Sequence, residues 1–171
     1  MIKRNSKSNL KGVFIDRDGT INEDRGYIFR IEDFRFIPGS LSALKKLTEA
    51  GVHIHIITNQ SGIAMGHYTE EDYFNLTHFM LNEFERHQIK VSDVVHCPHH
   101  AEGTVLRYQK VCKCRKPETG LIDPIIEREG YLPHHLAVIG DKNSDIEAGR
   151  RLGIRSYLVE TGFGADHRKT T

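Results

Sequence analysis

The sequence predicts an α/β fold, a doubly wound and mainly parallel sheet of the Rossmann-like type. Two observations predict it. Short apolar runs recur along the chain, and segments with helical periodicity separate them. Strands that alternate with helices in this way form parallel sheets covered on both faces. The 171 residues contain no repeat or linker, so we expect a single domain over residues 1–171, with 1–10 and 163–171 as flexible tails.

Five apolar runs are predicted to be strands. The first, GVFID, is continuously apolar up to Asp16, which is typical of a strand buried on both faces. The runs cover residues 12–16, 52–59, 91–97, 135–141 and 154–159.

Four segments between these runs are predicted to be helices. They cover residues 38–51, 69–87, 121–129 and 144–152. Leu41, Leu44 and Leu47 share one stripe of the first helix, and Gly51 ends it. The predicted caps are Ser40, Thr69 with Asp72, and Ser144 with Glu147. Pro124 falls inside the third segment, where it disturbs the start of the helix.

The composition is that of an ordinary globular protein. With 24 basic and 23 acidic residues and a net charge of +1, the chain lacks the charge pattern of a nucleic-acid-binding protein. No apolar run approaches the ~18 residues that a membrane span needs. The basic start, MIKRNSKSNLK, is not followed by the apolar segment of a signal peptide. We therefore expect a cytoplasmic monomer that binds neither nucleic acid nor membrane.

Polar residues stand where the predicted strands end. They are Asp16 and Asp18, Thr58 and Asn59, Cys97, and Asp141. Open parallel sheets bind ligands at the carboxyl ends of their strands, so we expect these residues to lie together. Lys116, in the stretch CRKP, precedes a predicted helix and belongs to the same edge.

The pair Asp16 and Asp18, in FIDRDGTIN, has two simpler explanations. An Asp-Gly turn would account for it without any chemistry, and these residues alone leave that alternative open. A calcium-binding EF-hand loop also begins Asp-x-Asp, but it needs Gly at position six and Glu at position twelve. Ile21 and Tyr27 stand there, which excludes the EF-hand.

The other motifs suit a phosphate and a divalent cation. TNQSG offers a hydroxyl, an amide and backbone N–H groups to phosphate oxygens. Lys116 supplies a positive charge, and GDKNSD adds Asp141 and Asp145, carboxylates of the kind that bind Mg²⁺ beside a phosphate. Each motif is common alone. The four together, in this order and at one sheet edge, indicate a phosphate-processing site.

These residues resemble the four motifs of haloacid-dehalogenase-type phosphatases, and the resemblance covers roughly residues 10 to 162. The matching residues are Asp16-x-Asp18-Gly19-Thr20, Thr58, Lys116 and Gly140-Asp141-x-x-x-Asp145. The resemblance implies that Asp16 forms an aspartyl-phosphate and that Asp18 acts as general acid and base. It implies that Thr58 and Lys116 hold the phosphoryl oxygens. The implied Mg²⁺ ligands are Asp16, Asp141 and the backbone carbonyl of Asp18.

The resemblance also indicates the residues that contact the substrate. They are Asp24, Arg25, Gly26, Tyr27, Asn59, Gln60, Ser61, Arg115 and Lys142. Asp145 is expected to orient Lys142 or the water shell of the metal. Only about twenty residues separate Gly19 from Ser40, too few for a separate cap domain, so we expect an open, capless site.

Within this family, the stretches GYIFRIEDFRFIPG and TNQSGIAMGHYTEEDY resemble members that hydrolyse a sugar bisphosphate in carbohydrate metabolism. Members that hydrolyse histidinol phosphate are the nearest alternative, but they tend to have Asp where Ser61 stands and a shorter cysteine-containing stretch. The non-enzyme alternative is a phosphoacceptor receiver domain. It would carry its aspartate at the end of the third strand, where Cys97 stands.

All three cysteines lie in the polar stretch CPHHAEGTVLRYQKVCKC, residues 97–114. An odd number of thiols and a reducing cytosol disfavour a disulfide. Cys97, His99, Cys112 and Cys114 are ligand types that structural zinc prefers, but their spacing differs from the familiar Cys-x-x-Cys pairs, so coincidence stays open on the residues alone. The family resemblance supports one structural Zn²⁺ on these four residues, distinct from the Mg²⁺.

Two other features are given no function. His53 and His55 share one face of the second strand, but a metal site needs more ligands than two. TGFGAD is expected to be a trailing turn before a disordered tail, because no helical pattern follows it.

Overall fold

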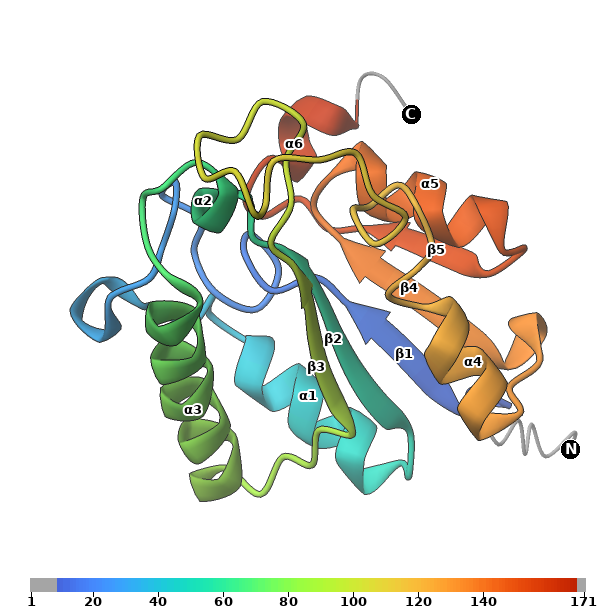
Figure 1. Cartoon of the computed structure of the whole chain (residues 1–171). Helices are drawn as coiled ribbons and strands as arrows, with labels where there is room; N and C mark the ends of the chain where they lie inside the picture. Colours follow the sequence, from blue (N-terminus) through green and yellow to red (C-terminus); the bar gives the residue numbers. More distant parts are fainter. Residues whose placement is uncertain (1–8, 169–171) are drawn as a thin grey trace, which may run out of the picture.

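The structure, a computed structural model, describes residues 9–168 and contains a five-stranded parallel sheet (Figure 1). The strands are β1 (Gly12–Ile15), β2 (His53–Asn59), β3 (Asp93–Cys97), β4 (Leu136–Gly140) and β5 (Arg155–Leu158). Each strand lies within a run that the sequence predicts. All pairings are parallel, which confirms the predicted fold class.

The strand order is β3-β2-β1-β4-β5, with β1 at the centre. From β1 the chain builds the sheet outward through β2 and β3, and then returns to the other side through β4 and β5. This reversal opens a crevice at the carboxyl ends of the central strands. Ile15, the last residue of β1, pairs with Ile56 of β2 and Ile139 of β4, so the residues that follow all three emerge at one edge.

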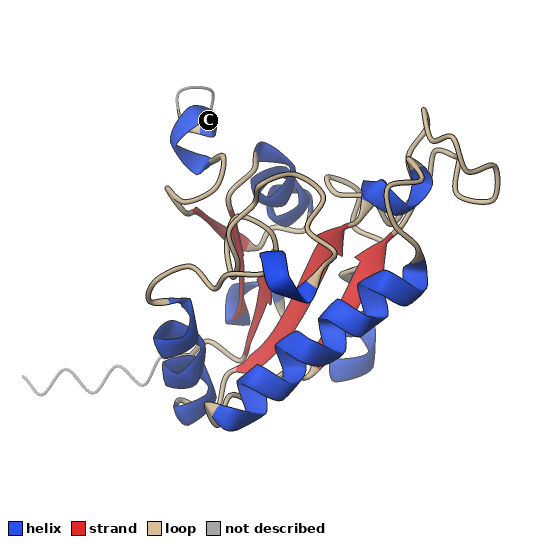
Figure 2. Cartoon of the chain, turned by 90° about the vertical axis from the view of Figure 1, so that its left-hand side faces the viewer, coloured by secondary structure: helices blue, strands red, loops and turns tan. Residues whose placement is uncertain are grey.

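Helices cover both faces of the sheet (Figure 2). They are η1 (Ile31–Asp33), α1 (Ser40–Glu49), α2 (Ser61–Ala64), α3 (Glu70–Arg86), α4 (Asp123–Glu129), η2 (Pro133–His135), α5 (Asn143–Arg151) and α6 (Gly164–His167). On one face, Leu44 of α1 and Met80 of α3 pack into a buried cluster with β1 and β2. On the other face, Ile125 of α4 and Ala148 of α5 do the same with β1 and β4. The two apolar cores hold the strand ends in fixed positions.

The predicted cap of α3 is confirmed, whereas that of α1 is wrong. Thr69 Oγ1 accepts the N–H of Asp72 at 3.1 Å, and the N–H of Thr69 donates to Asp72 Oδ2 at 2.8 Å. The N-cap of α1 is Gly39 rather than Ser40, which is the first helical residue. Gly39 has a φ of 91°, a left-handed conformation that favours glycine.

The start of α5 also differs from the prediction. Asp145 Oδ2 accepts the N–H of Lys142 at 3.0 Å, where Ser144 and Glu147 were expected to form the capping box. Glu147 instead forms ion pairs on the exposed side of the helix. Pro124 lies in the first turn of α4, where its missing N–H costs no helical hydrogen bond.

The chain after β5 folds back onto the sheet edge. Residues 163–168, which belong to the predicted C-terminal tail, contain the short helix α6. The N–H of Phe163 donates to Asp141 Oδ2 at 2.9 Å, which attaches the segment to the end of β4. At the other predicted tail, residues 1–10, Leu10 packs against the apolar core. Residues 1–8 and 169–171 of the predicted tails lie outside the described residues.

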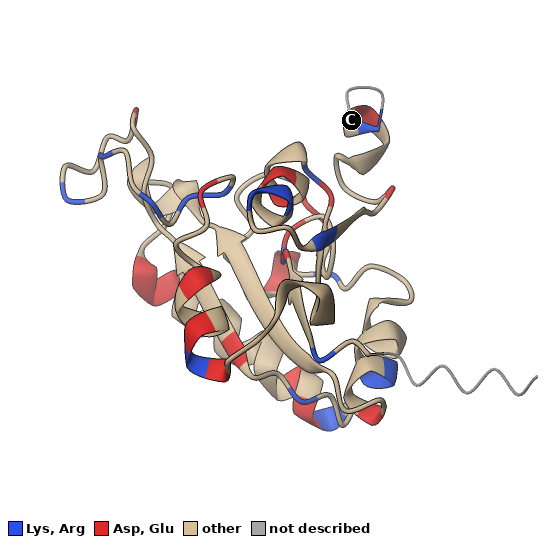
Figure 3. Cartoon of the chain, turned by 90° about the vertical axis from the view of Figure 1, so that its right-hand side faces the viewer, with Lys and Arg blue, Asp and Glu red and all other residues tan. Residues whose placement is uncertain are grey.

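Four observations bear on the broad class of protein. Between Gly19 and Ser40 the chain forms loops and the single turn η1, so the capless architecture is confirmed. Among residues 9–168 no helix is long and apolar enough to cross a membrane. Lys and Arg are interspersed with Asp and Glu on the side shown in Figure 3. The third strand ends at Cys97, a residue that cannot serve as the aspartate of a receiver domain.

His53, which is exposed, and His55, which is buried, take part in one hydrogen-bond cluster. Nδ1 of His55 lies 2.7 Å from Asp93 Oδ2, and its Nε2 lies 3.2 Å from the Tyr131 hydroxyl. Nδ1 of His53 lies 2.6 Å from the same hydroxyl. Neither histidine belongs to a group that could hold a metal within the described part of the chain.

We predict that the free energy of unfolding decreases as the pH falls below about 6.5, partly because of His55. Burial lowers the pKa of His55 from its ordinary value of 6.5, although the bond to Asp93 opposes the shift. The folded state therefore keeps the imidazole neutral while the unfolded chain takes up a proton, so stability present above that pH is lost below it. Urea denaturation between about pH 7.5 and about pH 5 would measure the change.

His55→Gln, which cannot titrate, should reduce this pH dependence. His134→Gln, at an exposed site in η2, is the matched control and should leave it unchanged. An unaltered pH dependence in His55→Gln would contradict the assignment.

Candidate active site

A polar cavity of about 340 Å³ lies at the carboxyl edge of the sheet, a volume suited to a small molecule. The predicted site residues that line it are Asp16, Asp18, Asp24, Gly26, Tyr27, Thr58, Asn59, Gln60, Ser61, Lys116 and Lys142. The predicted magnesium ligand Asp141 does not line it, and neither do two of the predicted substrate-contacting residues. Arg25 pairs with Glu23 at the surface at 2.6 Å, and Arg115 Nη1 lies 3.5 Å from the carbonyl oxygen of His99.

Lys116 is buried between two carboxylates. Its Nζ lies 2.8 Å from Asp16 Oδ1 and 2.6 Å from Asp145 Oδ1, and it donates to the carbonyl oxygen of Ile57 at 2.8 Å. The ammonium group thus joins the ends of β1 and β2 to the start of α5. Asp145 therefore contacts Lys116 through its side chain, and Lys142 only through the backbone N–H that it caps.

Burial and charge have opposing effects at this ion pair. Burial raises the pKa of Asp16 to about 7, although the charge of Lys116 acts to lower it. Burial alone would lower the pKa of Lys116, but the carboxylates of Asp145 and Asp16 outweigh it and raise that pKa, so the ammonium keeps its proton. A bound cation would add positive charge beside Asp16 and favour its carboxylate form.

Asp18 is held by three donors. Arg17 contacts both carboxylate oxygens through Nε and Nη2 at 2.9 to 3.2 Å. Asn22 Nδ2 donates to Oδ1 at 2.9 Å, and Gln60 Nε2 donates to Oδ2 at 2.8 Å. Burial would raise the pKa of Asp18, but Arg17 and these hydrogen bonds outweigh it and lower the pKa. Asp18 is therefore a carboxylate in the free protein.

The polar residues at the end of β2 hold other parts of the site. Thr58 Oγ1 accepts a hydrogen bond from Gln60 Nε2 at 2.8 Å. The amide of Asn59 binds the backbone of Lys116 on both sides, accepting its N–H at 3.0 Å and donating to its carbonyl oxygen at 3.1 Å. The lysine is therefore positioned through its backbone as well as its side chain.

The loop after β1 forms one wall of the cavity. The N–H of Gly26 donates to Asp24 Oδ1 at 2.9 Å, and the ring of Tyr27 lies against His67 with centroids 4.2 Å apart. Asp24 Oδ2 also lies 2.9 Å from Nζ of Lys142, a lining residue between β4 and α5. This ion pair links the loops that follow β1 and β4.

Asp16, Asp141 and Asp145 could hold a metal ion, because their carboxylate oxygens lie within 4.8 Å of one another and all three are buried. Asp141 Oδ1 is buried without a hydrogen-bond partner in the described chain. Gly19 and Gly162 permit the close approach of Asp141 Oδ2, since a Cβ at either would lie 2.1 or 2.3 Å from it. Buried carboxylate oxygens that lack a hydrogen-bond partner are suitable ligands for Mg²⁺. The residues therefore fit this ion.

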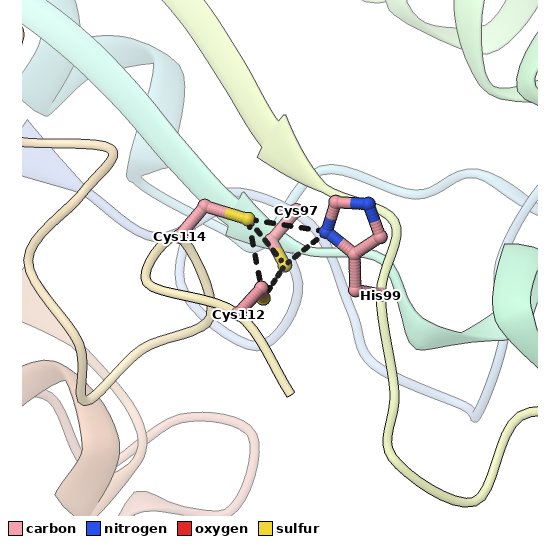
Figure 4. A group of neighbouring side chains, drawn as sticks. All are labelled: Cys97, His99, Cys112 and Cys114. Atoms are coloured by element: carbon pink, nitrogen blue, oxygen red, sulfur yellow. Dashed lines mark hydrogen bonds between the residues drawn. The ribbon is translucent and has the colours of Figure 1, made fainter. Parts of the chain in front are cut away.

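The four predicted zinc ligands lie together, as Figure 4 shows. Cys114 Sγ lies 3.0 Å from Cys97 Sγ, 3.3 Å from Cys112 Sγ and 3.3 Å from His99 Nδ1. Ligand atoms around one zinc at about 2.0 to 2.3 Å would lie roughly 3 to 4 Å apart, which is the observed range. His100 is outside the cluster, because its Nδ1 accepts the N–H of Glu102 at 3.2 Å.

The thiols differ in their surroundings. Burial raises the pKa of Cys97 and of Cys114. At Cys112 the neighbouring thiols outweigh burial and lower the pKa. Burial thus opposes the ionisation of two of the three thiols, whereas a bound zinc ion would deprotonate all three.

Several site residues were not recognised in the sequence. The cavity also contains Ile28, Gly62, Tyr68, Ser144 and Phe163. Arg17 and Asn22 stand within FIDRDGTIN, so their closeness to Asp18 along the chain was a usable signal. Tyr68 and Phe163 lie within TNQSGIAMGHYTEEDY and TGFGAD but were not singled out there, and only the folded chain shows that they reach the cavity.

Comparisons with known proteins give a consistent result. Residues 113–170 match a HAD-hydrolase-like family model. Over 154 residues the chain is 42% identical to D-glycero-alpha-D-manno-heptose-1,7-bisphosphate 7-phosphatase of Photorhabdus laumondii, covering 90% of this chain and 84% of the relative. Over 153 residues it is 37% identical to D-glycero-beta-D-manno-heptose-1,7-bisphosphate 7-phosphatase of Haemophilus influenzae, covering 89% and 83%.

Solved structures share the fold. D,D-heptose 1,7-bisphosphate phosphatase from B. bronchiseptica, crystallised with magnesium and phosphate, has a TM-score of 0.85 at 28% identity, covering 95% of this chain and 87% of its own. The enzyme of that name from Burkholderia thailandensis has a TM-score of 0.68 at 27% identity, covering 94% and 85%. Paired aspartates at the end of a central parallel strand, beside a buried lysine and a magnesium-type carboxylate group, define a magnesium-dependent phosphatase. The chain belongs to the haloacid-dehalogenase-type phosphatases.

We predict that Mg²⁺ stabilises the protein against unfolding and that Asp141→Asn removes most of this effect. The variant keeps an oxygen that can accept the N–H of Phe163 but loses the charge that a cation needs. A ligand at 100 times its dissociation constant stabilises the folded state by about 2.7 kcal/mol. Thermal denaturation with Mg²⁺ and with a chelator would measure the difference.

Asp33→Asn, which neutralises an exposed acid in η1, is the matched control and should respond to Mg²⁺ like the wild type. An equal response of Asp141→Asn would place the cation elsewhere.

Proposed function

We propose that the protein hydrolyses the 7-phosphate of D-glycero-D-manno-heptose 1,7-bisphosphate. The observation that carries this proposal is the 42% identity, over 90% of the chain, to a relative named for that reaction. Ser61, where histidinol-phosphate phosphatases tend to have Asp, lines the cavity. We place the reaction in the biosynthesis of nucleotide-activated heptose for lipopolysaccharide, carried out by a cytoplasmic monomer.

In the first half of the reaction, a carboxylate oxygen of Asp16 attacks the phosphorus and forms an aspartyl-phosphate while the bond to the sugar oxygen breaks. Lys116, already 2.8 Å from Asp16, holds this carboxylate in place and places a fixed positive charge beside the phosphoryl group. The hydroxyl of Thr58 donates to a phosphoryl oxygen. Mg²⁺, held by Asp16, Asp141 and the backbone carbonyl of Asp18, supplies further positive charge for the phosphoryl oxygens when bound.

Asp18 transfers the protons. It protonates the leaving sugar oxygen in the first half and takes a proton from the attacking water in the second. In the free protein its pKa is lowered, which suits the second role. The arrival of a phosphate anion beside Asp18 raises its pKa, because like charges disfavour ionisation, and this favours the first role.

We further propose that Cys97, His99, Cys112 and Cys114 bind one structural Zn²⁺. Four protein ligands leave no position for a reactive water, so this ion has no direct catalytic role. The stretch from 98 to 116 contains no helix or strand, and the last ligand stands two residues before Lys116. We infer that zinc shapes this stretch and thereby delivers Lys116 to Asp16.

The substrate proposal predicts that heptose 1,7-bisphosphate has the highest kcat/KM in a panel of phosphomonoesters. The panel contains both anomers of this compound, fructose 1,6-bisphosphate and histidinol phosphate, with phosphate release as the measurement. Both anomers are included because one relative is named for the alpha anomer and another for the beta anomer. A preference for histidinol phosphate of about tenfold or more would contradict the substrate but leave the mechanism in place.

Two variants test the mechanism in the same panel. Asp16→Asn should abolish turnover, because an amide is neither a competent nucleophile nor a good magnesium ligand. Asp18→Asn should slow turnover by roughly 10² to 10⁴, the usual loss when general acid–base catalysis is removed. Turnover close to that of the wild type in either variant would contradict the aspartyl-phosphate mechanism.

The zinc proposal predicts about one tightly bound zinc per chain, which Cys112→Ser should lose. Metal analysis of the purified protein would measure the zinc content. Because metal binding contributes to folding, this variant should also unfold at a lower temperature and bind substrate more weakly.

His100→Ala, which changes the histidine beside the cluster, is the matched control and should keep its zinc. A wild-type protein that is active without zinc, or a Cys112→Ser variant that retains it, would show that the cluster has another purpose.

A further inference from the structure

Gln60 lines the cavity but is almost completely buried. Only 2% of it is exposed. Nε2 donates to Asp18 Oδ2 and to Thr58 Oγ1, each at 2.8 Å, so both of its hydrogens are engaged. Oε1 accepts from the hydroxyl of Tyr68. A substrate would therefore find no free donor on this amide, although the sequence indicated Gln60 as a substrate-binding residue.

The partners fix which way the amide points. A carboxylate only accepts hydrogen bonds, so the atom that faces Asp18 must be the nitrogen. Burial raises the pKa of Tyr68, which keeps its hydroxyl protonated and able to donate to Oε1. Exchanging the nitrogen and oxygen would put an acceptor against Asp18 and leave buried polar groups unpaired, which is unfavourable.

This orientation has consequences for two reacting groups. Thr58 Oγ1 accepts from Gln60, so its own hydrogen stays available for a phosphoryl oxygen. Gln60 Nε2 also holds one carboxylate oxygen of Asp18. This shared contact fixes the distance between Asp18, which transfers protons, and Thr58, which holds the phosphoryl group. On the basis of the proposed phosphatase reaction, we propose that Gln60 is a positioning residue. It aligns Asp18 with Thr58 and does not contact the substrate.

The test is Gln60→Met, which keeps the length of the side chain but removes both donors. The expected result is a fall in kcat of about tenfold or more with KM changed less than about twofold, since alignment acts on the transition state rather than on substrate binding. The fall should be greater for heptose 1,7-bisphosphate than for p-nitrophenyl phosphate, whose leaving group departs without a proton. Dependence on the leaving group would not follow from a loss of folding alone.

Ser61→Ala provides the contrast. Because Ser61 lines the cavity, its replacement should raise KM and change kcat little. If Gln60→Met folds poorly, Gln60→Leu also lacks both donors and should give the same result. A raised KM with unchanged kcat would show that Gln60 binds substrate. An equal loss for both substrates would show a structural role only.

The proposed substrate and this inference can fail separately. If the wild type cleaves p-nitrophenyl phosphate but not the heptose bisphosphate, the substrate proposal fails, and the best alkyl phosphate of the panel replaces it in the Gln60 comparison.

Discussion

The site depends on the buried ion pair between Lys116 and the carboxylates of Asp16 and Asp145. Removing an ion from water costs several kcal/mol, and only close partners with good geometry offset that cost. Here the partners come from the end of β1 and the start of α5, and a carbonyl of β2 completes the shell. A displacement of any of these elements would leave a charge buried without its partner. The parallel sheet provides the fixed strand ends that this arrangement requires.

The same ion pair explains why the site suits a divalent cation. When all three are ionised, Asp16, Asp141 and Asp145 bring three negative charges together, and Lys116 offsets one of them. Lys142 is paired with Asp24, and Arg17 is paired with Asp18, so neither is free to offset the rest. The excess of two negative charges equals the charge of one Mg²⁺. In the free protein, the side chains of the site therefore leave a negative charge that a bound cation would neutralise.

The sequence was informative wherever a local pattern determined the structure. Parallel strands end at one edge, so reading the polar residue after each apolar run was enough to bring Asp16, Thr58 and Asp141 together. Other features, such as the helix caps, depended on the local backbone conformation. The caps of α1 and α5 depended on the φ of Gly39 and on the pairing of Asp145, which no residue pattern specifies.

Contacts between distant segments were harder to predict. The bonds from Asn59 to the Lys116 backbone and from Phe163 to Asp141 join segments whose separation depends on the whole fold. In the sequence, a polar residue after a strand has the same appearance whether its side chain faces a ligand or hydrogen-bonds to a neighbouring residue. Gln60 shows this ambiguity, because its amide could serve either purpose until its partners were known.

The two ion pairs of the cavity differ in how readily they can be exchanged. Lys116 is 2% exposed, and its partners cannot be replaced by water. The side chain of Lys142 is 34% exposed and that of Asp24 is 10% exposed, so solvent reaches the ammonium group more readily than the carboxylate. An anionic substrate can therefore approach Lys142 from the solvent, whereas the charges around Lys116 are shielded from it. The open, capless site thus combines a buried charge pair at its floor with a more accessible cation at its rim.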